Sequence, residues 1–165
     1  MIKSAPEPKR HLIAVQAIVK NLSIFRSMPA REQKALLAGI LFLPLISVGV
    51  RLFGLVRVQA WLDRSPLASQ APLNQPEAAA LGVAVNRAAN HILGPASCLT
   101  RSLLLRWLLR RFGTPSDLRI GVCFEQGKLA AHAWVEKDGI PVNDRPEMVA
   151  RFAAFDQPVS PDMFS

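Results

Sequence analysis

The residues from Gly94 to Gly113 constrain the fold of this chain most strongly, and they read GPASCLTRSLLLRWLLRRFG. Gly94-Pro95 would end any preceding element, and Ser97 or Ala96 can cap a new helix. Gly113 is a typical helix stop. Between these signals arginine is the only charged residue type, and the predicted helix is apolar on nearly every side. A helix of that kind is normally buried in a core.

Cys98 stands on the first turn of this predicted helix. It begins a stripe at the spacing of one helical face, formed by Cys98, Ser102, Leu105, Leu109 and Phe112. The positive end of the helix dipole favours the thiolate form of a thiol placed there. A buried cysteine is more often a small apolar residue without chemistry. Cys98 alone therefore indicates a candidate nucleophile and no more.

Composition is typical of one domain with a substantial core, since 50% of the 165 residues are hydrophobic. The two cysteines, Cys98 and Cys123, are too few for a disulfide framework, and no signal peptide is recognisable. We therefore expect a cytoplasmic protein with reduced thiols.

The net charge of +8 is unevenly distributed. Residues 1–64 carry ten Lys/Arg against three acidic residues, and residues 116–165 carry five against eight. A basic front is compatible with an anionic membrane surface, an acidic peptide or nucleic acid, and equally with a solvated basic rim. Nucleic acid is the weakest of these, because the arginines lie among leucines, tyrosine is absent and no binding motif is present. We expect no nucleic-acid partner and regard a peripheral membrane contact as possible.

Residues 1–64 are predicted to form a helical N-terminal extension, and residues 65–165 a separate domain. Helical spacing runs from His11 to Ile24, and Ser27-Met28-Pro29 indicates a second helix start. The stretch Ala35–Val50 has no charge but is shorter than the roughly 20 residues of a membrane span. A buried helix pair kinked at Pro44 is the first interpretation, a membrane-surface helix the second and a span the third.

A further helix is predicted from Asn74-Gln75-Pro76-Glu77 to about Leu93. Its apolar positions share one face, and they are Leu81, Val85, Ala88 and Ile92. Its polar residues Asn86, Asn90 and His91 are expected to be exposed or capping, although one of them could reach the surroundings of the cysteine.

After the Cys98 helix the apolar period changes from 3.6 to 2. Leu118–Phe124 and Leu129–Glu136 are predicted strands joined around Gln126-Gly127. A third strand follows from Ile140 to Asn143 or Asp144, and a short helix from there to Phe155. Helices followed by an antiparallel meander indicate an α+β fold.

Strand register brings three polar side chains together. A three-residue loop at Lys137–Gly139 pairs Glu136 with Ile140, which sets His132 opposite Asp144. The first hairpin sets Gly121 opposite His132 for either a two- or a four-residue loop. A glycine there leaves room for the helix that carries Cys98. A two-residue loop at Asp138-Gly139 would instead turn Asp144 to the other face.

Thiol, imidazole and carboxylate then have separate roles. His132 would take the proton from Cys98 and later protonate a leaving amine, and Asp144 would orient the ring. The backbone N–H of Cys98 would help to bind the oxyanion.

Each residue also has a structural interpretation. His132 could be a satisfied core group, Asp144 a helix cap, Trp134 core or cleft wall, and Cys123 an apolar filler. A zinc site from Cys98, Cys123, His132 and Asp144 is disfavoured, because no close ligand pair exists. We expect no metal and no cofactor.

Four segments together resemble the transglutaminase-like cysteine peptidases that mature lasso peptides, namely SCLTRSLLLRWLLRRFG, LRIGVCF, AHAWVE and PVND. The resemblance covers about Ser27 to Phe155, and the family often has proline where this chain has Thr100. It implies a papain-like or transglutaminase-like peptidase core over residues 65–165, with Cys98 as nucleophile, His132 as base and acid, and Asp144 as orienting carboxylate.

The resemblance further implies removal of the leader peptide from a ribosomally made precursor. A separate leader-binding protein and an ATP-dependent lasso cyclase are the implied partners, because residues 1–60 show no strands of a leader-binding domain. Two rivals stay open. One keeps the triad in an acyltransferase or amidase, and the other is a non-enzymatic basic scaffold for a membrane or a partner.

Overall fold

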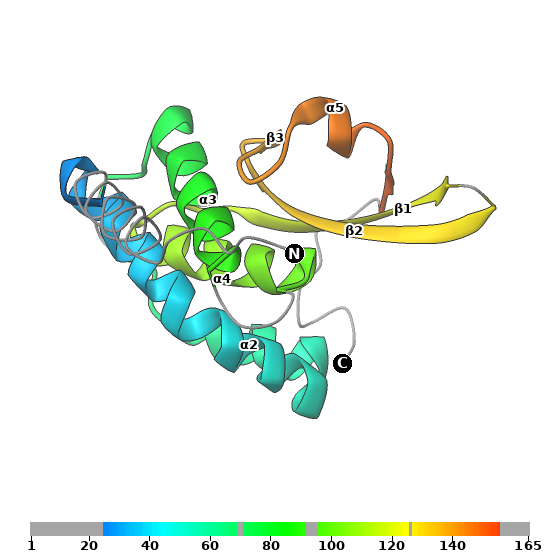
Figure 1. Cartoon of the computed structure of the whole chain (residues 1–165), viewed down its shortest axis with the longest axis horizontal. Coiled ribbons are helices and arrows are strands. Elements are labelled where there is room, and N and C mark those ends of the chain that lie inside the picture. The colour runs from blue at the N-terminus through cyan, green and yellow to red at the C-terminus, as the bar shows by residue number, and fades with distance from the viewer. Residues whose placement is uncertain (1–24, 69–70, 92–95, 126, 156–165) are drawn as a thin grey trace, which may run out of the picture.

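The computed structural model describes residues 25–68, 71–91, 96–125 and 127–155, and it confirms the predicted α+β fold. Three helices pack together beside a curled antiparallel sheet, and a short helix lies over the sheet (Figure 1). The elements are α2 (Ala30–Asp63), α3 (Gln75–Ala89), α4 (Cys98–Arg111), β1 (Asp117–Glu125), β2 (Lys128–Lys137), β3 (Ile140–Pro141), α5 (Pro146–Val149) and β4 (Ala153–Ala154). The predicted helix at His11–Ile24 lies outside the described residues, as do Ile92, Gly94-Pro95 and Gln126.

Helix α2 begins after Pro29 with Glu32 in its first turn, as the sequence predicted. Its backbone breaks at Gly54, which has a φ of 78°, and not at the predicted Pro44, which lies inside the first arm of the helix. Glycine adopts a positive φ without the steric cost of a side chain, so the reversal falls there. The expected buried helix pair is half correct, because one face of α2 is buried and the other is exposed. The domain boundary at residue 64 stays a prediction.

Helix α3 starts with a capping box. The Asn74 side chain accepts from the Glu77 N–H, and the Glu77 carboxylate accepts from the Asn74 N–H. Leu81, Val85 and Ala88 are buried on one face, as predicted. Asn86 corrects the prediction, because it is neither exposed nor capping: its Nδ2 donates to the Asn143 carbonyl at 2.9 Å.

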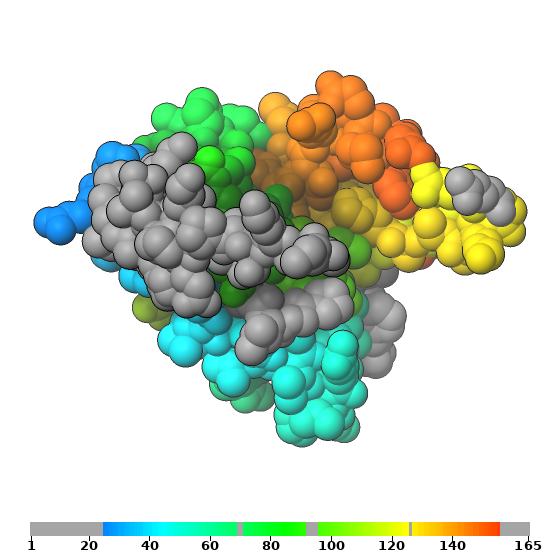
Figure 2. Space-filling model, in the orientation of Figure 1, coloured from blue at the N-terminus to red at the C-terminus, as the bar shows by residue number. Residues whose placement is uncertain are grey.

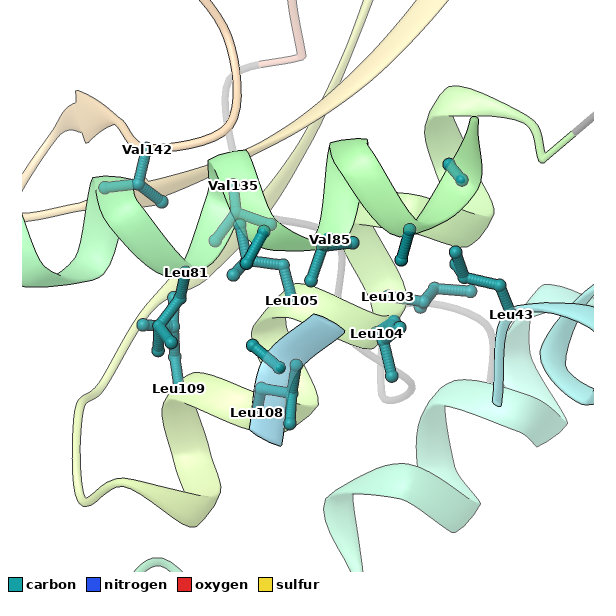
Figure 3. Packing of buried hydrophobic residues seen from close by; sticks show 14 of the residues in the cluster. Leu43, Leu81, Val85, Leu103, Leu104, Leu105, Leu108, Leu109, Val135 and Val142 are labelled. Carbon is teal, nitrogen blue, oxygen red and sulfur yellow. The ribbon is translucent and has the colours of Figure 1, made fainter. Parts of the chain in front are cut away.

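Helix α4 lies in the middle of the core, as its apolar surface predicted. Ser97 caps it by accepting from the Thr100 N–H. Gly113, with a φ of 68°, ends it in a Schellman arrangement in which Thr114 N–H bonds Leu109 O. Figure 3 shows its leucines interleaved with side chains from α2, α3 and β2. The buried members it labels are Leu43, Leu81, Val85, Leu103, Leu104, Leu105, Leu108, Leu109, Val135 and Val142.

The sheet has the order β3-β2-β1-β4. The first hairpin closes through a two-residue loop, and Gly121 pairs with His132 as the register prediction required. Its tip extends away from the helices (Figures 1 and 2). Phe124 and Leu129 at that tip are exposed.

The second hairpin corrects the predicted register. Lys137 pairs with Ile140, so the loop is the two-residue Asp138-Gly139 and not the three-residue one. Both loop residues have positive φ, 51° and 76°, as the turn that suits the right-handed twist of a hairpin requires. Aspartate tolerates that conformation better than most residues do, which makes the shorter loop accessible.

The predicted third strand is also too long, because β3 ends at Pro141. Proline has no N–H for a ladder, and the chain then bends over residues 142–144 toward α3. Gly82 permits this contact, since a Cβ at that position would lie 2.1 Å from the Val142 carbonyl oxygen. Val142 is buried in the core, so this bend is tightly packed.

The chain beyond this bend differs from the helix predicted up to Phe155. Helix α5 ends at Val149, its N-cap is Arg145 with no side-chain cap bond, and Asp144 is therefore not the cap. Residues Ala153 and Ala154 instead form β4 on the outer edge of β1.

Candidate active site

His132 and Asp144 form a hydrogen-bonded pair at the middle of β2. The distance from Nε2 of His132 to Oδ2 of Asp144 is 2.9 Å. The two side chains are 20% and 27% exposed, so both are partly open to solvent. With Nε2 engaged by the carboxylate, Nδ1 is the ring nitrogen left for proton exchange.

Two aromatic rings confine the imidazole. His132 stacks on Trp134 with ring centroids 6.2 Å apart, and Phe152 lies 5.1 Å away in a tilted contact. Trp134 is buried and donates from Nε1 to the Glu136 carboxylate at 2.7 Å. Gly121 keeps this arrangement compact, because a Cβ there would lie 3.0 Å from both the Trp134 ring and Phe152. Trp134 is thus both a buried residue and a wall of the site.

Cys98 is the first residue of α4 and is half-buried, with a free thiol. It shares a helical face with Ser102, Leu105 and Leu109, all of which are buried. Cys98 is therefore the partly exposed end of a helical face that is otherwise buried. Within the described residues no hydrogen bond joins Cys98 to His132. Cys98 is the first residue of α4, so its N–H precedes the intrahelical hydrogen bonds and lies at the helix end that attracts anions.

Ser102 and Asn143 complete the hydrogen bonding of β2 beyond the end of β3. The Val135 carbonyl accepts from the Val142 N–H, so the peptide groups of Val135 point to the side of β2 on which β3 lies. The peptide groups of Ala133, two residues earlier, point to the same side. Ser102 Oγ donates to Ala133 O at 3.0 Å, and Asn143 Oδ1 accepts from Val135 N–H at 2.8 Å. Asn143 Nδ2 also donates to Ser102 Oγ at 3.0 Å. These two side chains take the place of a third strand.

This edge network joins the three segments that carry the predicted triad. Ser102 is one turn after Cys98, a rise of about 6 Å along the helix. Ala133 follows His132, and Asn143 precedes Asp144. The Ser102–Ala133 hydrogen bond ties the helix that begins with the thiol to the strand that carries the imidazole. The predicted His132–Asp144 contact therefore exists, but it depends on this bend and not on the predicted ladder.

Ser102, Asn143 and Asn86 are the positions that sequence reasoning did not assign to the site. The signal for Ser102 was a hydroxyl on an otherwise apolar buried stripe. Asn143 had only its place beside Asp144. Asn86 was one of three polar helix residues that could reach the surroundings of the cysteine, but nothing along the chain singled it out as the partner of the Asn143 carbonyl.

Cys123 lies on β1, half-buried and free. Over the described ranges, no group of three or more His, Cys, Asp or Glu side chains could hold a metal ion. What the site offers is a thiol at a helix start, an imidazole held by a carboxylate, and the N-terminal end of α4, which favours negative charge. That set suits nucleophilic attack on a carbonyl carbon.

The comparisons with known proteins bear on the fold and family. The family model that matches is the transglutaminase-like superfamily, over residues 40–155, which contain Cys98, His132 and Asp144. No curated protein and no solved structure matches the chain. Since the match covers well over half of its length, the chain belongs to the transglutaminase-like superfamily, which includes cysteine peptidases.

Proposed function

We propose that this protein is a cysteine endopeptidase that removes the leader peptide from a ribosomal lasso-peptide precursor, using Cys98, His132 and Asp144. The observation that carries the proposal is the 2.9 Å His132–Asp144 pair, tied by Ser102 and Asn143 to the helix that begins at Cys98. Membership of the superfamily supports the same chemistry.

In the proposed reaction the Cys98 sulfur attacks the carbonyl carbon of the scissile peptide bond, and its proton passes to Nδ1 of His132. The Cys98 N–H binds the oxyanion. The C–N bond then breaks, and His132 returns the proton to the leaving amine, which becomes the N-terminus of the core peptide. Water, deprotonated by His132, hydrolyses the thioester and restores the thiol. Asp144 holds the ring and stabilises its positive charge throughout.

The substrate class rests on the motifs around the triad, SCLTRS, AHAWVE and PVND. The proposed partners follow from the same resemblance. They are the precursor peptide, a separate leader-binding protein that presents it, and an ATP-dependent cyclase that uses the freed amine. We also propose a cytoplasmic location, which both free thiols suit.

The test is cleavage of a synthetic precursor with the leader-binding protein present, followed by mass spectrometry. Cys98→Ala should reduce cleavage to background, because no other side chain can replace the nucleophile. Cys123→Ala is the matched control, since it removes the other free thiol and should leave cleavage unchanged.

Undiminished cleavage by the Cys98→Ala variant would refute the proposed mechanism. The same products separate peptidase from acyl transfer. If an added amine is found attached to the leader carboxylate in place of water, the triad is right and the protein is an acyltransferase.

A further inference from the structure

We propose that the outer face of α2 docks on an anionic membrane surface, a role independent of the proposed peptidase activity. The first arm of α2 carries two apolar stripes on opposite sides. The inner stripe, made of Ala35, Gly39, Leu43 and Ile46, is buried against the rest of the domain. The outer stripe is Leu37, Leu41, Leu45, Val48 and Leu52, each between 53% and 70% exposed.

The outer stripe repeats every three to four residues, so it forms one continuous face. It extends from Leu37 to Leu52, a rise of about 22 Å along a helix. Ile40 beside it is also exposed, and so is Phe53, which directly precedes the Gly54 break. A contiguous exposed apolar face of this length marks an interaction surface.

Beyond Gly54 the second arm of α2 folds back and forms a groove of about 1080 Å³ with the first arm. Figure 2 shows both arms along the border of the molecule away from the sheet. The apolar side chains in its lining include Phe42, Leu45, Val48, Phe53, Trp61 and Trp107. The charged ones are Arg57 and Arg64, both exposed cations. An apolar groove with only positive charge around it suits an anionic amphiphile.

The charges along α2 favour the same partner. Between Gln33 and Leu62 the charged residues are Lys34, Arg51 and Arg57, and all three are exposed. Lys34 precedes the outer stripe and Arg51 lies near its end, so cations flank the apolar face. Anionic headgroups attract such cations while the apolar side chains enter the acyl boundary.

A lipid surface fits this face better than a protein does. A protein interface of ordinary size carries about ten hydrogen bonds. The outer stripe offers no hydrogen-bonding side chain apart from the flanking cations, and Ser47 is turned inward to Thr100 on α4. Helix α2 is long and apolar enough to cross a membrane by length and composition. Spanning would require removing the inner stripe, including the fully buried Leu43, from the core.

The experiment is flotation of the full-length protein with phosphatidylcholine vesicles, with and without phosphatidylglycerol. We expect binding to the anionic vesicles and little to the neutral ones. Leu41→Ser with Leu45→Ser should weaken binding roughly ten-fold or more, because two inserted leucines are lost. Phe124→Ser with Leu129→Ser is the matched control, since these hairpin-tip residues are more exposed than Leu41 and Leu45 but lie off the face, and this variant should bind normally.

A second variant tests the electrostatic part. Arg51→Gln with Arg57→Gln should lower affinity for anionic vesicles roughly ten-fold and weaken the salt dependence of binding, because Lys34 and Arg64 remain. Circular dichroism checks that each variant is folded.

Four results would overturn the proposal. The first is the absence of vesicle binding, and a second is an equal loss of binding in the hairpin control. A third is self-association that Leu41→Ser with Leu45→Ser abolishes in the absence of lipid, which would assign the face to a second copy. The fourth is resistance to extraction by high salt and carbonate, which would indicate a spanning helix.

Discussion

The edge of β2 beyond the short β3 differs from the outer face of α2. Hydrogen bonds within the protein complete the first, whereas the apolar side chains of the second stay exposed. At the β2 edge, the peptide groups left open by the short β3 are bonded by Ser102 and Asn143. On α2, the outer stripe of Leu37, Leu41, Leu45, Val48 and Leu52 is apolar and stays exposed in the part of the chain that the structure describes. One surface is completed by the fold, and the other is left for something outside it.

The difference shows how one domain can keep a catalytic site and a docking face apart. Unsatisfied peptide groups at a strand edge cost free energy, so the fold fills that edge and gains a rigid site. An exposed apolar face costs less in a monomer and becomes favourable only when it is covered. The candidate active site therefore depends on internal geometry, whereas the docking face depends on an external partner.

The largest expected effect separates the two regions by activity. His132→Ala should reduce precursor cleavage roughly 10²–10⁴-fold, because proton transfer is lost. Vesicle binding by the same variant should be unchanged, since His132 lies on β2 and not on α2. Cleavage rates and flotation measured on one preparation check both statements. A parallel loss of both would show that the two regions are not independent.

The next effect contrasts the two stripes of α2 by stability. Leu43→Ala should lower the free energy of unfolding by about 2–5 kcal/mol, because it leaves a cavity in the core. Leu41→Ala removes the same atoms from an exposed position and should change it by no more than about 0.5 kcal/mol. Urea denaturation monitored by tryptophan fluorescence gives both values. Equal losses would mean that the outer stripe is covered within the protein.

The smallest expected effect concerns the β2 edge. Asn143→Ala should cost about 1–3 kcal/mol of stability, because the Val135 N–H loses its acceptor. It should also lower kcat more than it raises KM, since Asp144 loses its anchor. Asn143→Asp keeps the acceptor oxygen and should recover part of the stability.

A double-mutant cycle of Asn143→Ala with Ser102→Ala tests the network itself. The two changes should be non-additive by about 0.5–3 kcal/mol, because the side chains share a hydrogen bond. Additive losses would contradict the proposed network.

Local signals in the sequence determined most of the secondary structure. The Ser97 cap, the Gly113 stop and the Asn74–Glu77 capping box each fixed a helix end through bonds between neighbouring residues. The register of the first hairpin could be predicted because a two-residue and a four-residue loop both pair Gly121 with His132. Such features depend on contacts between residues a few positions apart, so a short stretch of sequence is enough to predict them.

Other features depended on contacts between distant segments. Nothing local distinguished Gly54 from Pro44 as the break in α2, or the two-residue Asp138-Gly139 loop from a longer one. The predicted contact of His132 with Asp144 is present, but strand pairing does not produce it. The bend after Pro141 does. The chain leaves the sheet after Pro141 because Gly82 admits the Val142 carbonyl against α3.

The sequence by itself determined the helix ends, the hairpin and the identities of the chemically capable residues. The tertiary structure decided which of these meet, through Ser102 and Asn143 at the β2 edge, and which face of α2 stays exposed. The physical reason is that a hydrogen bond or a buried stripe between distant segments is specified by both partners together. Neither partner carries that information in its own neighbourhood.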